Sequence, residues 1–413
     1  MNKCKNFILL LALLAMPASI AAEDVVQVTP FTTTAGISLA DEETFSMEMV
    51  NTNAYTALEF HLFLPEGITL DKDFIDLNPD RFPGKYRRGV FYPDHVCDVT
   101  NPSPGHYYVK IYNSDLETIE GTEGEILSFY YATAADMKPG IYPIRVTGTI
   151  LAVDSHNSAE PPASVSFVKI TDANGNVPAN ALLDLGSDEI PSFVQTELPE
   201  KNVIIGGVCE NLVLTDGADF ETANAFTATQ ASLTTNVNAY KTLVLPFDAA
   251  VPTGFTAKNA VSVTGTSIDL EASATINAGQ PVLIEGEGLF ELSASNVAVA
   301  ATSDANLTNG LLCGTYKAIT ASVGSYVLQK HGNVIGFYLV EDVQPFVRAF
   351  HAYLNIPDPG VKALFFSDEA TGIGEEINEK LKMNDDVFDL SGRKVNGQLP
   401  KGVYIMNDHK VLF

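Results

Sequence analysis

The chain has 413 residues, of which 46% are hydrophobic and 18% charged, and it carries a net charge of −27. This length and composition indicate two or three folded domains and exclude a disordered polymer. Because 51 acidic residues face 24 basic ones, the balance argues against nucleic acid or an anionic membrane surface as the partner. Such acidity is typical of a well-solvated protein surface.

The N-terminus has the pattern of a secretory signal peptide. Two lysines in the first five residues precede the apolar run Phe7 to Met16, and small residues follow it. The run is shorter than the stretch of about 20 residues that spans a bilayer. We predict cleavage after Ala21 or Ala22, assign residues 1–22 to the signal peptide, and expect no transmembrane helix in the mature chain.

Three cysteines remain after this leader, and they do not form a disulfide framework. Cys209 and Cys313 could pair within one domain, but isolated thiols are the interpretation that we favour for them and for Cys97. The sequence has no Cys-x-x-Cys pair and no histidine beside another histidine or a carboxylate at helical spacing. We therefore predict no metal site and no cofactor.

Residues 23–170 alternate between apolar and polar side chains with a period of two, which predicts strands with one buried face. Glycine and proline turns separate these short strands, as in a β-sandwich. The apolar positions of the first clear runs are Phe45, Met47 and Met49, then Leu58, Phe60, Leu62 and Leu64, the latter alternating with Glu59, His61 and Phe63. Later runs of the same kind are His106 to Tyr112, Glu125 to Ala134, Ile141 to Val153 and Ser164 to Ile170.

The order of these strands follows a specific pattern. An asparagine-rich turn leads into ALEFHLFLPEGITL (57–70), and a Glu-Gly turn precedes EILSFYYATA (125–134). This resembles the cohesin-like domains of secreted Bacteroidales proteins. The resemblance implies a nine-stranded jelly-roll sandwich of the kind that carbohydrate-binding domains share. Cohesins bind calcium-loaded dockerins through a sheet face and relatives of the fold bind polysaccharide, so it implies an extracellular protein or a polysaccharide as partner, without assigning contact residues.

Residues 171–201 have polar turns and no sustained period, which indicates a linker or an irregular crossing segment. The run Asp172 to Asn176 has some features of a calcium loop. An EF-type loop would need glycine at its sixth position and a carboxylate at its twelfth, and these are Val177 and Leu183. We therefore predict a plain Asn-Gly turn.

Residues 202–367 again read as strands separated by turns, which predicts a second β-sandwich. The runs KTLVLPFDAAVPTGFTA (241–257) and GSYVLQKHGNVIGFY (324–338), with their neighbours in order, resemble an uncharacterised β-rich module of surface proteins from the same bacteria. That family has no established chemistry. The fold predicted for the chain is therefore all-β, with two β-sandwich domains of jelly-roll or immunoglobulin-like type in tandem and a short C-terminal β-module.

The C-terminal part consists of a charged tether, residues 368–386, and four short strand candidates in residues 387–413. The last segment resembles the sorting signal of cargo for the type nine secretion system of Bacteroidetes, which implies contact with outer-membrane secretion machinery and display at the cell surface. An alternative is that the tail docks on the second sandwich as extra strands. The matching positions are Val387, Asp389, Leu390, Gly392, Arg393 and Val395, followed by Lys401, Gly402, Tyr404 and Ile405.

The sequence has no catalytic motif such as Gly-x-Ser-x-Gly or His-Glu-x-x-His. The one suggestive pair is His95 and Cys97, which would point to the same face of a strand. Such a pair is more often part of the packing, so we predict that the chain is not an enzyme. An unrecognised secreted hydrolase remains an alternative.

A sugar-binding platform requires exposed flat aromatic rings, and the chain has no tryptophan. Tyrosines could replace it on one face if residues 106–112 and 125–134 form neighbouring strands: Tyr107, Tyr108, Tyr112, Tyr130 and Tyr131. Alternation sends about half of them into the core. We therefore predict a non-catalytic secreted or cell-surface protein that mediates adhesion or assembly through protein contacts. The alternative is a carbohydrate-binding protein of a polysaccharide-utilisation apparatus.

Overall fold

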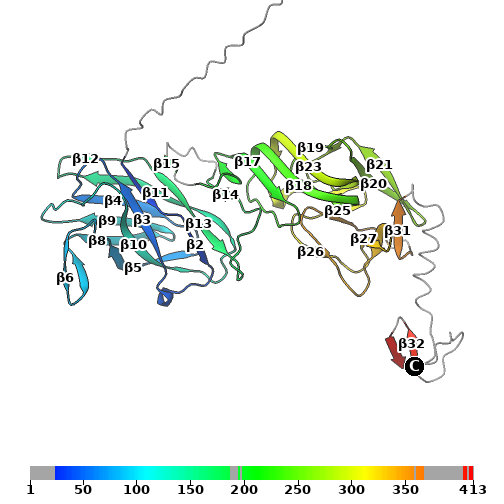
Figure 1. Ribbon diagram of the computed structural model, residues 1–413, viewed down its shortest axis with the longest axis horizontal. Helices are drawn as coiled ribbons and strands as arrows, with labels where there is room; N and C mark the ends of the chain where they lie inside the picture. Colours follow the sequence, from blue (N-terminus) through cyan, green and yellow to red (C-terminus); the bar gives the residue numbers. More distant parts are fainter. Residues whose placement is uncertain are drawn as a thin grey trace, which may run out of the picture. The chain divides into compact units, whose positions relative to one another are not determined.

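The computed structural model describes residues 24–186, 194–195, 198–357, 360–366, 403–406 and 409–412. The chain divides into two compact units (Figure 1). The first comprises Met1–Lys138, Tyr142–Ala173 and Ile190–Leu198, and the second comprises Pro139–Ile141, Asn174–Glu189 and Pro199–Phe413. The described residues form strands and two short 3₁₀ turns, η1 (Leu39–Asp41) and η2 (Thr302–Asp304), so the all-β prediction is confirmed. None of the described residues forms a helix that is long and apolar enough to cross a membrane.

The first unit is a sandwich of a four-stranded sheet, in the order β1-β3-β10-β5, and an eight-stranded sheet that follows the order β15-β13-β11-β4-β9-β8, with β12 beside β11 and β2 beside β13. A separate two-stranded hairpin, β6-β7, leaves this sandwich between β5 and β8. The strands are β1 (Val25–Val28), β2 (Phe31–Thr34), β3 (Thr44–Val50), β4 (Ala57–Phe63), β5 (Ile68–Leu77), β6 (Gly84–Arg87), β7 (Val90–Pro93), β8 (Val96–Ser103), β9 (His106–Tyr112), β10 (Glu125–Thr133), β11 (Gly140–Ala152), β12 (Ser158–Ala159), β13 (Ser164–Thr171) and β15 (Val194–Gln195).

The core of the first unit lies between the two sheets and is built by the alternation seen in the sequence. Phe60 and Leu62 of β4 are fully buried, as are Met47 and Met49 of β3. The other predicted inward positions, Phe45, Leu58 and Leu64, are also buried, so this prediction is confirmed. Burying such side chains contributes roughly 1.5–3 kcal/mol each, which makes the choice of face the main determinant of the sheet pairing.

A buried arginine forms hydrogen bonds to several groups of this sandwich. Arg81 is only 4% exposed, and its Nη2 donates to Asn51 Oδ1 at 2.6 Å. Its Nη1 donates to the carbonyl oxygens of Met49 and Gly124, each at 3.3 Å. Burial lowers the pKa of Arg81 from its ordinary value. The guanidinium therefore ties the end of β3 to the loop that enters β10.

The segment 171–201, which the sequence indicates as a linker or crossing segment, contributes short strands to both units. β15 pairs in parallel with β13 of the first unit. β14 (Leu183–Asp184) pairs in parallel with β16 of the second unit. Within the segment, Gly175 has a φ of 81°, which suits the predicted Asn-Gly turn.

The second unit contains one continuous hydrogen-bonded path of strands, in the order β14-β16-β17-β18-β23-β20-β21-β31-β28-β27-β30-β25-β24, with two further pairs, β19-β22 and β26-β29. The strands are β16 (Val203–Ile205), β17 (Val208–Thr215), β18 (Phe226–Leu243), β19 (Ala249–Ala250), β20 (Thr256–Thr264), β21 (Ser267–Ser273), β22 (Thr275–Ile276), β23 (Val282–Val299), β24 (Thr308–Asn309), β25 (Leu312–Gly314), β26 (Ile319–Thr320), β27 (Tyr326–His331), β28 (Val334–Leu339), β29 (Phe346–Val347), β30 (Ala352–Leu354) and β31 (Ala363–Phe366).

The long strands β18 and β23 are neighbours in the sheet of the second unit. They pair antiparallel from Phe226 opposite Val299 to Leu243 opposite Val282. Ile284 of β23 lies in one hydrophobic cluster and its neighbour Leu283 lies in a second. Because adjacent strand residues point to opposite faces, the sheet is covered on both sides at this point.

The last described residues form a hairpin of β32 (Val403–Met406) and β33 (His409–Leu412), which pair antiparallel. These are the two final strands expected from the sequence. The positions Asp389, Leu390, Gly392, Arg393, Lys401 and Gly402 lie outside the described residues, as do the signal peptide and the tether. Tyr404 lies on β32.

The Arg81→Lys substitution tests the role of the buried guanidinium. An ammonium group cannot reach all three oxygen acceptors, so we expect the free energy of unfolding of the first unit to fall by about 2 kcal/mol. Urea unfolding of the full chain, followed by circular dichroism, measures this. Arg88→Lys at an exposed position is the matched control and is expected to change stability by less than about 0.5 kcal/mol. Equal effects of the two substitutions would contradict the role of Arg81.

Candidate functional site

The outward face of the eight-stranded sheet carries an unusual row of rings. β4 and β9 pair antiparallel from Ala57 opposite Tyr112 to Phe63 opposite His106. Since Leu58, Phe60 and Leu62 point into the core, the residues between them point outward. We call this surface the outer face; its members on β4 and β9 are Glu59, His61, Phe63, His106, Tyr108, Lys110 and Tyr112.

Four of these rings stack on one another across the two strands. Phe63 and His106 lie parallel with centroids 4.4 Å apart, and His61 and Tyr108 lie parallel with centroids 4.5 Å apart. The two pairs are joined by a hydrogen bond of 2.9 Å between His61 Nδ1 and His106 Nε2. The four rings are therefore connected as two stacked pairs, with a tilted contact of 5.1 Å between the His61 and His106 centroids.

Two charged side chains contact Tyr108. The hydroxyl of Tyr108 donates to Glu59 Oε2 at 2.7 Å, and Lys110 Nζ lies 4.6 Å from the centroid of the Tyr108 ring. Burial, and then the Glu59 carboxylate, raise the pKa of Tyr108, so its hydroxyl remains a neutral donor. Tyr108 is thus covered by His61 on one ring face and approached by an ammonium group, which fixes its orientation.

The neighbouring strands extend the outer face. On β8, Asp98 Oδ2 accepts a hydrogen bond of 3.0 Å from the hydroxyl of Tyr112. On β11, Arg145 lies opposite Phe63 in the sheet register. A bulge follows Thr147, where Gly148 has a φ of 58° and a Cβ at this position would lie 3.0 Å from His61 Cδ2. Glycine at the bulge therefore leaves the space that the imidazole occupies.

The structure places the five predicted tyrosines on different surfaces. The two runs are not neighbouring strands, because β9 pairs with β4 and β8 while β10 pairs with β3 and β5. The expected single exposed face of tyrosines is therefore wrong. Tyr107 is 5% exposed and Tyr131 is 2% exposed, so both belong to the core. This agrees with the expectation that alternation along a strand sends about half of the tyrosines inward. Tyr130 lies on the opposite sheet, where its hydroxyl donates to Asp76.

Tyr108 and Tyr112 do lie on the outer face, and their role in binding stays a prediction. His61 and His106 are not among the site residues predicted from the sequence. A signal for His61 was present, because it alternates with the core residues of the first strand run. Which strand would lie beside it was not visible, and the stack depends on that neighbour.

The pair His95 and Cys97 does not have the properties of a catalytic dyad. His95 is 2% exposed and packs edge-on against Phe82, with centroids 5.0 Å apart. Burial, and then the charge of Asp98, raise the pKa of Cys97 to about 12, so this thiol stays protonated at neutral pH. The three cysteines in the described residues are free, and Cys209 is buried while Cys97 and Cys313 are half-buried.

The second unit contains a partly buried ionic cluster. Asp216 Oδ2 lies 2.6 Å from Lys241 Nζ, and Asp216 Oδ1 lies 3.3 Å from His351 Nε2. Burial alone would raise the pKa of this carboxyl, but hydrogen bonds from His351 and Lys241 hold it well below its usual range. The carboxylate is therefore charged at neutral pH and stabilises its two partners.

A threonine completes an arrangement that looks like a nucleophile triad. Thr242 Oγ1 lies 3.5 Å from Nδ1 of His351. However, Thr242 is only 3% exposed and its hydroxyl accepts a hydrogen bond of 3.0 Å from the backbone N–H of Ala352. Thr242 and His351 also line a pocket of about 340 Å³. The hydrogen bond from Ala352 gives the Thr242 hydroxyl a role in the local fold.

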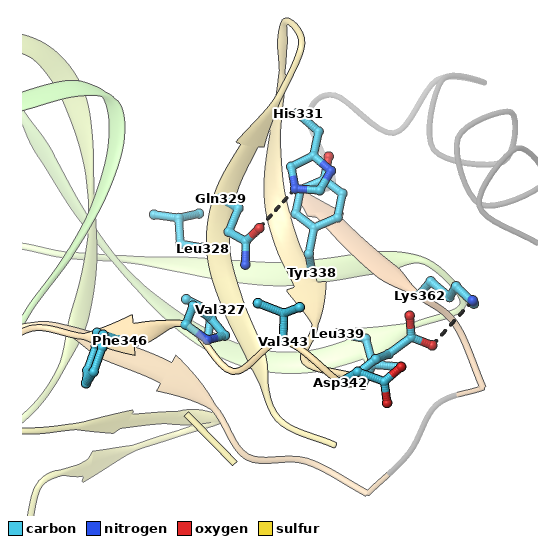
Figure 2. Close-up of a pocket in the computed structure, with 12 residues that line it drawn as sticks. Val327, Leu328, Gln329, His331, Tyr338, Leu339, Asp342, Val343, Phe346 and Lys362 are labelled. Atoms are coloured by element: carbon cyan, nitrogen blue, oxygen red, sulfur yellow. Dashed lines mark hydrogen bonds and ion pairs between the residues drawn. The ribbon is translucent and has the colours of Figure 1, made fainter. Parts of the chain in front are cut away.

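A pocket of about 590 Å³ lies beside the hairpin of β27 and β28 (Figure 2). Figure 2 shows the imidazole of His331 against the ring of Tyr338. The centroids of these two rings are 3.9 Å apart, and Lys362 Nζ lies 3.3 Å from Glu341 Oε1. The walls combine aliphatic side chains with aromatic, polar and charged ones, and Phe346 is 75% exposed. Among the described residues that line the pocket, the acids are Glu341 and Asp342, which are consecutive in the chain.

Among the residues that the structure describes, no group of three or more histidine, cysteine, aspartate or glutamate side chains is placed to hold a metal ion.

Comparison with known proteins gives structural neighbours only. No family model matches the chain, and no curated protein matches it. The sixth cohesin of scaffoldin B from Acetivibrio cellulolyticus, solved in complex with a Cel5 dockerin, is 10% identical with a TM-score of 0.28 and covers 36% of this chain and 99% of its own. A non-cellulosomal cohesin from the archaeon Archaeoglobus fulgidus is 12% identical with a TM-score of 0.26, over 37% of this chain and 93% of its own.

A cohesin module from a family 33 glycoside hydrolase of Clostridium perfringens is 8% identical with a TM-score of 0.24, over 36% of this chain and 98% of its own. The structural neighbours are therefore cohesin modules, each covered almost completely by about a third of this chain.

The burial of His95 predicts a pH dependence of stability. Burial lowers the pKa of His95 below its ordinary value of 6.5, and the backbone groups of Glu117 and Thr56 offset only part of this. The unfolded chain therefore binds a proton that the folded chain does not, so the free energy of unfolding falls as the pH drops below about 6.5. The total loss is about 1.4 kcal/mol for each pH unit by which folding lowers the pKa of His95.

Unfolding measured between about pH 7 and about pH 5 checks this dependence. We expect His95→Phe to flatten the decline, while His156→Phe at an exposed position leaves it unchanged. An unaltered slope in His95→Phe would show that other groups cause the decline.

Proposed function

We propose that the chain is a non-catalytic binding protein whose first unit docks a protein partner on the outer face. The observation that carries this proposal is the ring stack. Sugar binding by aromatic residues uses an open ring face, whereas in the pairs Phe63 with His106 and His61 with Tyr108 each ring has one face covered by its partner, at 4.4 and 4.5 Å.

The charge of the outer face supports a protein partner. The chain as a whole carries −27, but this face balances Glu59 and Asp98 with Lys110 and Arg145. Protein interfaces are enriched in aromatic residues and arginine, and complementary charges around them fix the orientation of the partner. A face with this composition within an acidic protein is suited to direct contact with another folded surface.

The rigidity of the stack also favours binding. The rings are fixed by mutual stacking, by the His61–His106 hydrogen bond and by the Tyr108–Glu59 hydrogen bond. A surface that is ordered before binding loses little side-chain entropy when the partner arrives. The absence of rearrangement leaves more of the contact free energy for affinity.

Secretion and surface display are the second part of the proposal. The leader of residues 1–22 supports export, and the segment 387–413 supports attachment at the outer surface. A protein that assembles others at a cell surface needs both a sorting signal and a docking face. Adhesion or surface assembly is therefore the role that we propose.

Photo-crosslinking tests the docking face. A benzophenone amino acid at Thr100, which is exposed and opposite Tyr108 in the register, is expected to give one defined crosslinked protein in envelope extracts. The same group at Thr69, exposed on β5 of the other sheet, is the matched control and is expected to give none. The double variant His61→Ala/Tyr108→Ala should reduce the crosslinked yield at least tenfold. Binding to neutral glycans that is lost in Tyr108→Ala would overturn the choice of a protein partner.

Truncation tests the sorting role of residues 387–413. A chain ending at Ser367 retains the strands from β1 to β31 but lacks the C-terminal segment, so we expect it to be exported into the medium or retained in the periplasm rather than displayed. Protease accessibility on intact cells measures display. Normal display of the truncated chain would rule out the sorting role of residues 387–413.

A further inference from the structure

The β6–β7 hairpin is a basic and aromatic element on an acidic protein. Its ten residues, Gly84 to Pro93, read GKYRRGVFYP and contain three cations and no carboxylate. The hairpin pairs only with itself, and Figure 1 shows it projecting away from the sheets of the first unit. Residues 84–90 are all exposed. This segment contributes little to the core, which leaves its composition without a structural explanation.

The two faces of the hairpin follow from its register. Lys85 pairs with Tyr92 and Arg87 with Val90, so these four side chains share one face. Tyr86 shares the other face with Phe91, at a centroid distance of 5.2 Å. Each face of this thin ribbon therefore presents a tyrosine.

The tyrosine rings of the hairpin are more exposed than Phe63 and Tyr112 of the outer face, which are 38% and 42% exposed. Tyr86 is 66% exposed and Tyr92 is 51% exposed. The guanidinium carbon of Arg87 lies 6.0 Å from the Tyr92 centroid, at the limit of a cation–π contact. These rings are accessible for stacking, and cations lie directly beside them.

The turn places a third cation at the tip against the preference of the backbone. Arg88 has a φ of 54° and Gly89 a φ of 82°, which together make a two-residue turn with both residues left-handed. Asparagine, aspartate or glycine is the usual residue at the first position, and another residue costs about 1–2 kcal/mol. Arginine at this position is therefore not explained by turn formation.

The electrostatic setting makes the hairpin tip accessible to an anion. A four-residue strand is about 13 Å long. The Debye length at physiological ionic strength is about 8 Å, so the tip is screened from most of the acidic body. Lys85 is the cation nearest the base, 3.8 Å from Asp94, and both side chains are exposed, so this pair is weak. All three cations can therefore act on a ligand.

We propose that the β6–β7 hairpin binds an acidic polysaccharide. The open tyrosine rings would stack on the sugar rings, and Lys85, Arg87 and Arg88 would pair with its carboxylate or sulfate groups. A linear, flexible polymer can contact both faces of a projecting ribbon, whereas a folded protein would cover one. This site is separate from the outer face and does not depend on the protein partner proposed for it.

Binding of the full chain to immobilised polygalacturonate and chondroitin sulfate tests the proposal and separates carboxylate from sulfate. Lys85→Ala/Arg87→Ala/Arg88→Ala is expected to weaken binding at least tenfold, and Tyr92→Ala at least threefold with all cations retained. The control Lys72→Ala/Lys138→Ala/Lys330→Ala removes the same charge from exposed positions elsewhere and should change binding less than twofold. A circular-dichroism melt establishes that each variant is folded.

Arg88→Asn separates binding from folding. Asparagine suits the left-handed position, so we expect the melting temperature to stay the same or to rise while binding weakens at least threefold. The proposal is overturned if the natural chain binds neither polymer, or if the control variant loses as much binding as the hairpin variant. Equal binding to polyglutamate would also overturn it, because the hairpin would then be selecting an acidic polypeptide.

Discussion

The pairing of β4 with β9 is the constraint on which the first unit depends. In this register Phe60 and Val109 are both fully buried, while His61 and Tyr108, one step away on each strand, stack on the outside. A slip of one residue would move the rings into the core and the core into solvent. The hydrophobic effect therefore fixes the outer face indirectly, because it selects the register that places these rings together.

The first unit presents two surfaces with opposite chemistry. On the outer face the rings cover one another and the charges balance, which suits a firm contact with a folded partner. On the β6–β7 hairpin the rings are open and the charges are all positive, which suits an anionic polymer. A protein that holds a partner with one surface and an extracellular matrix with another would connect the two at the cell surface.

The alternation in the sequence was sufficient to predict the strands and the core of the first unit, because burial of Phe45 or Leu58 depends mainly on the period of two. The pairing of strands was not predictable in the same way. The sequence suggested that the tyrosines of β9 and β10 shared a face, and the structure separates them into two sheets. Long-range register depends on contacts between residues far apart in the chain, such as His61 and His106, and no local pattern contains that information.

The central claim is that the outer face is the docking surface, and hydroxyl-radical footprinting of the full chain, with and without its captured partner, measures it most directly. The account predicts that Phe63, His106 and Tyr108 become protected from oxidation in the complex. Tyr130, half-buried on β10 of the other sheet, should react equally in both states. Protection of Tyr130 with no change at the ring stack would contradict the account.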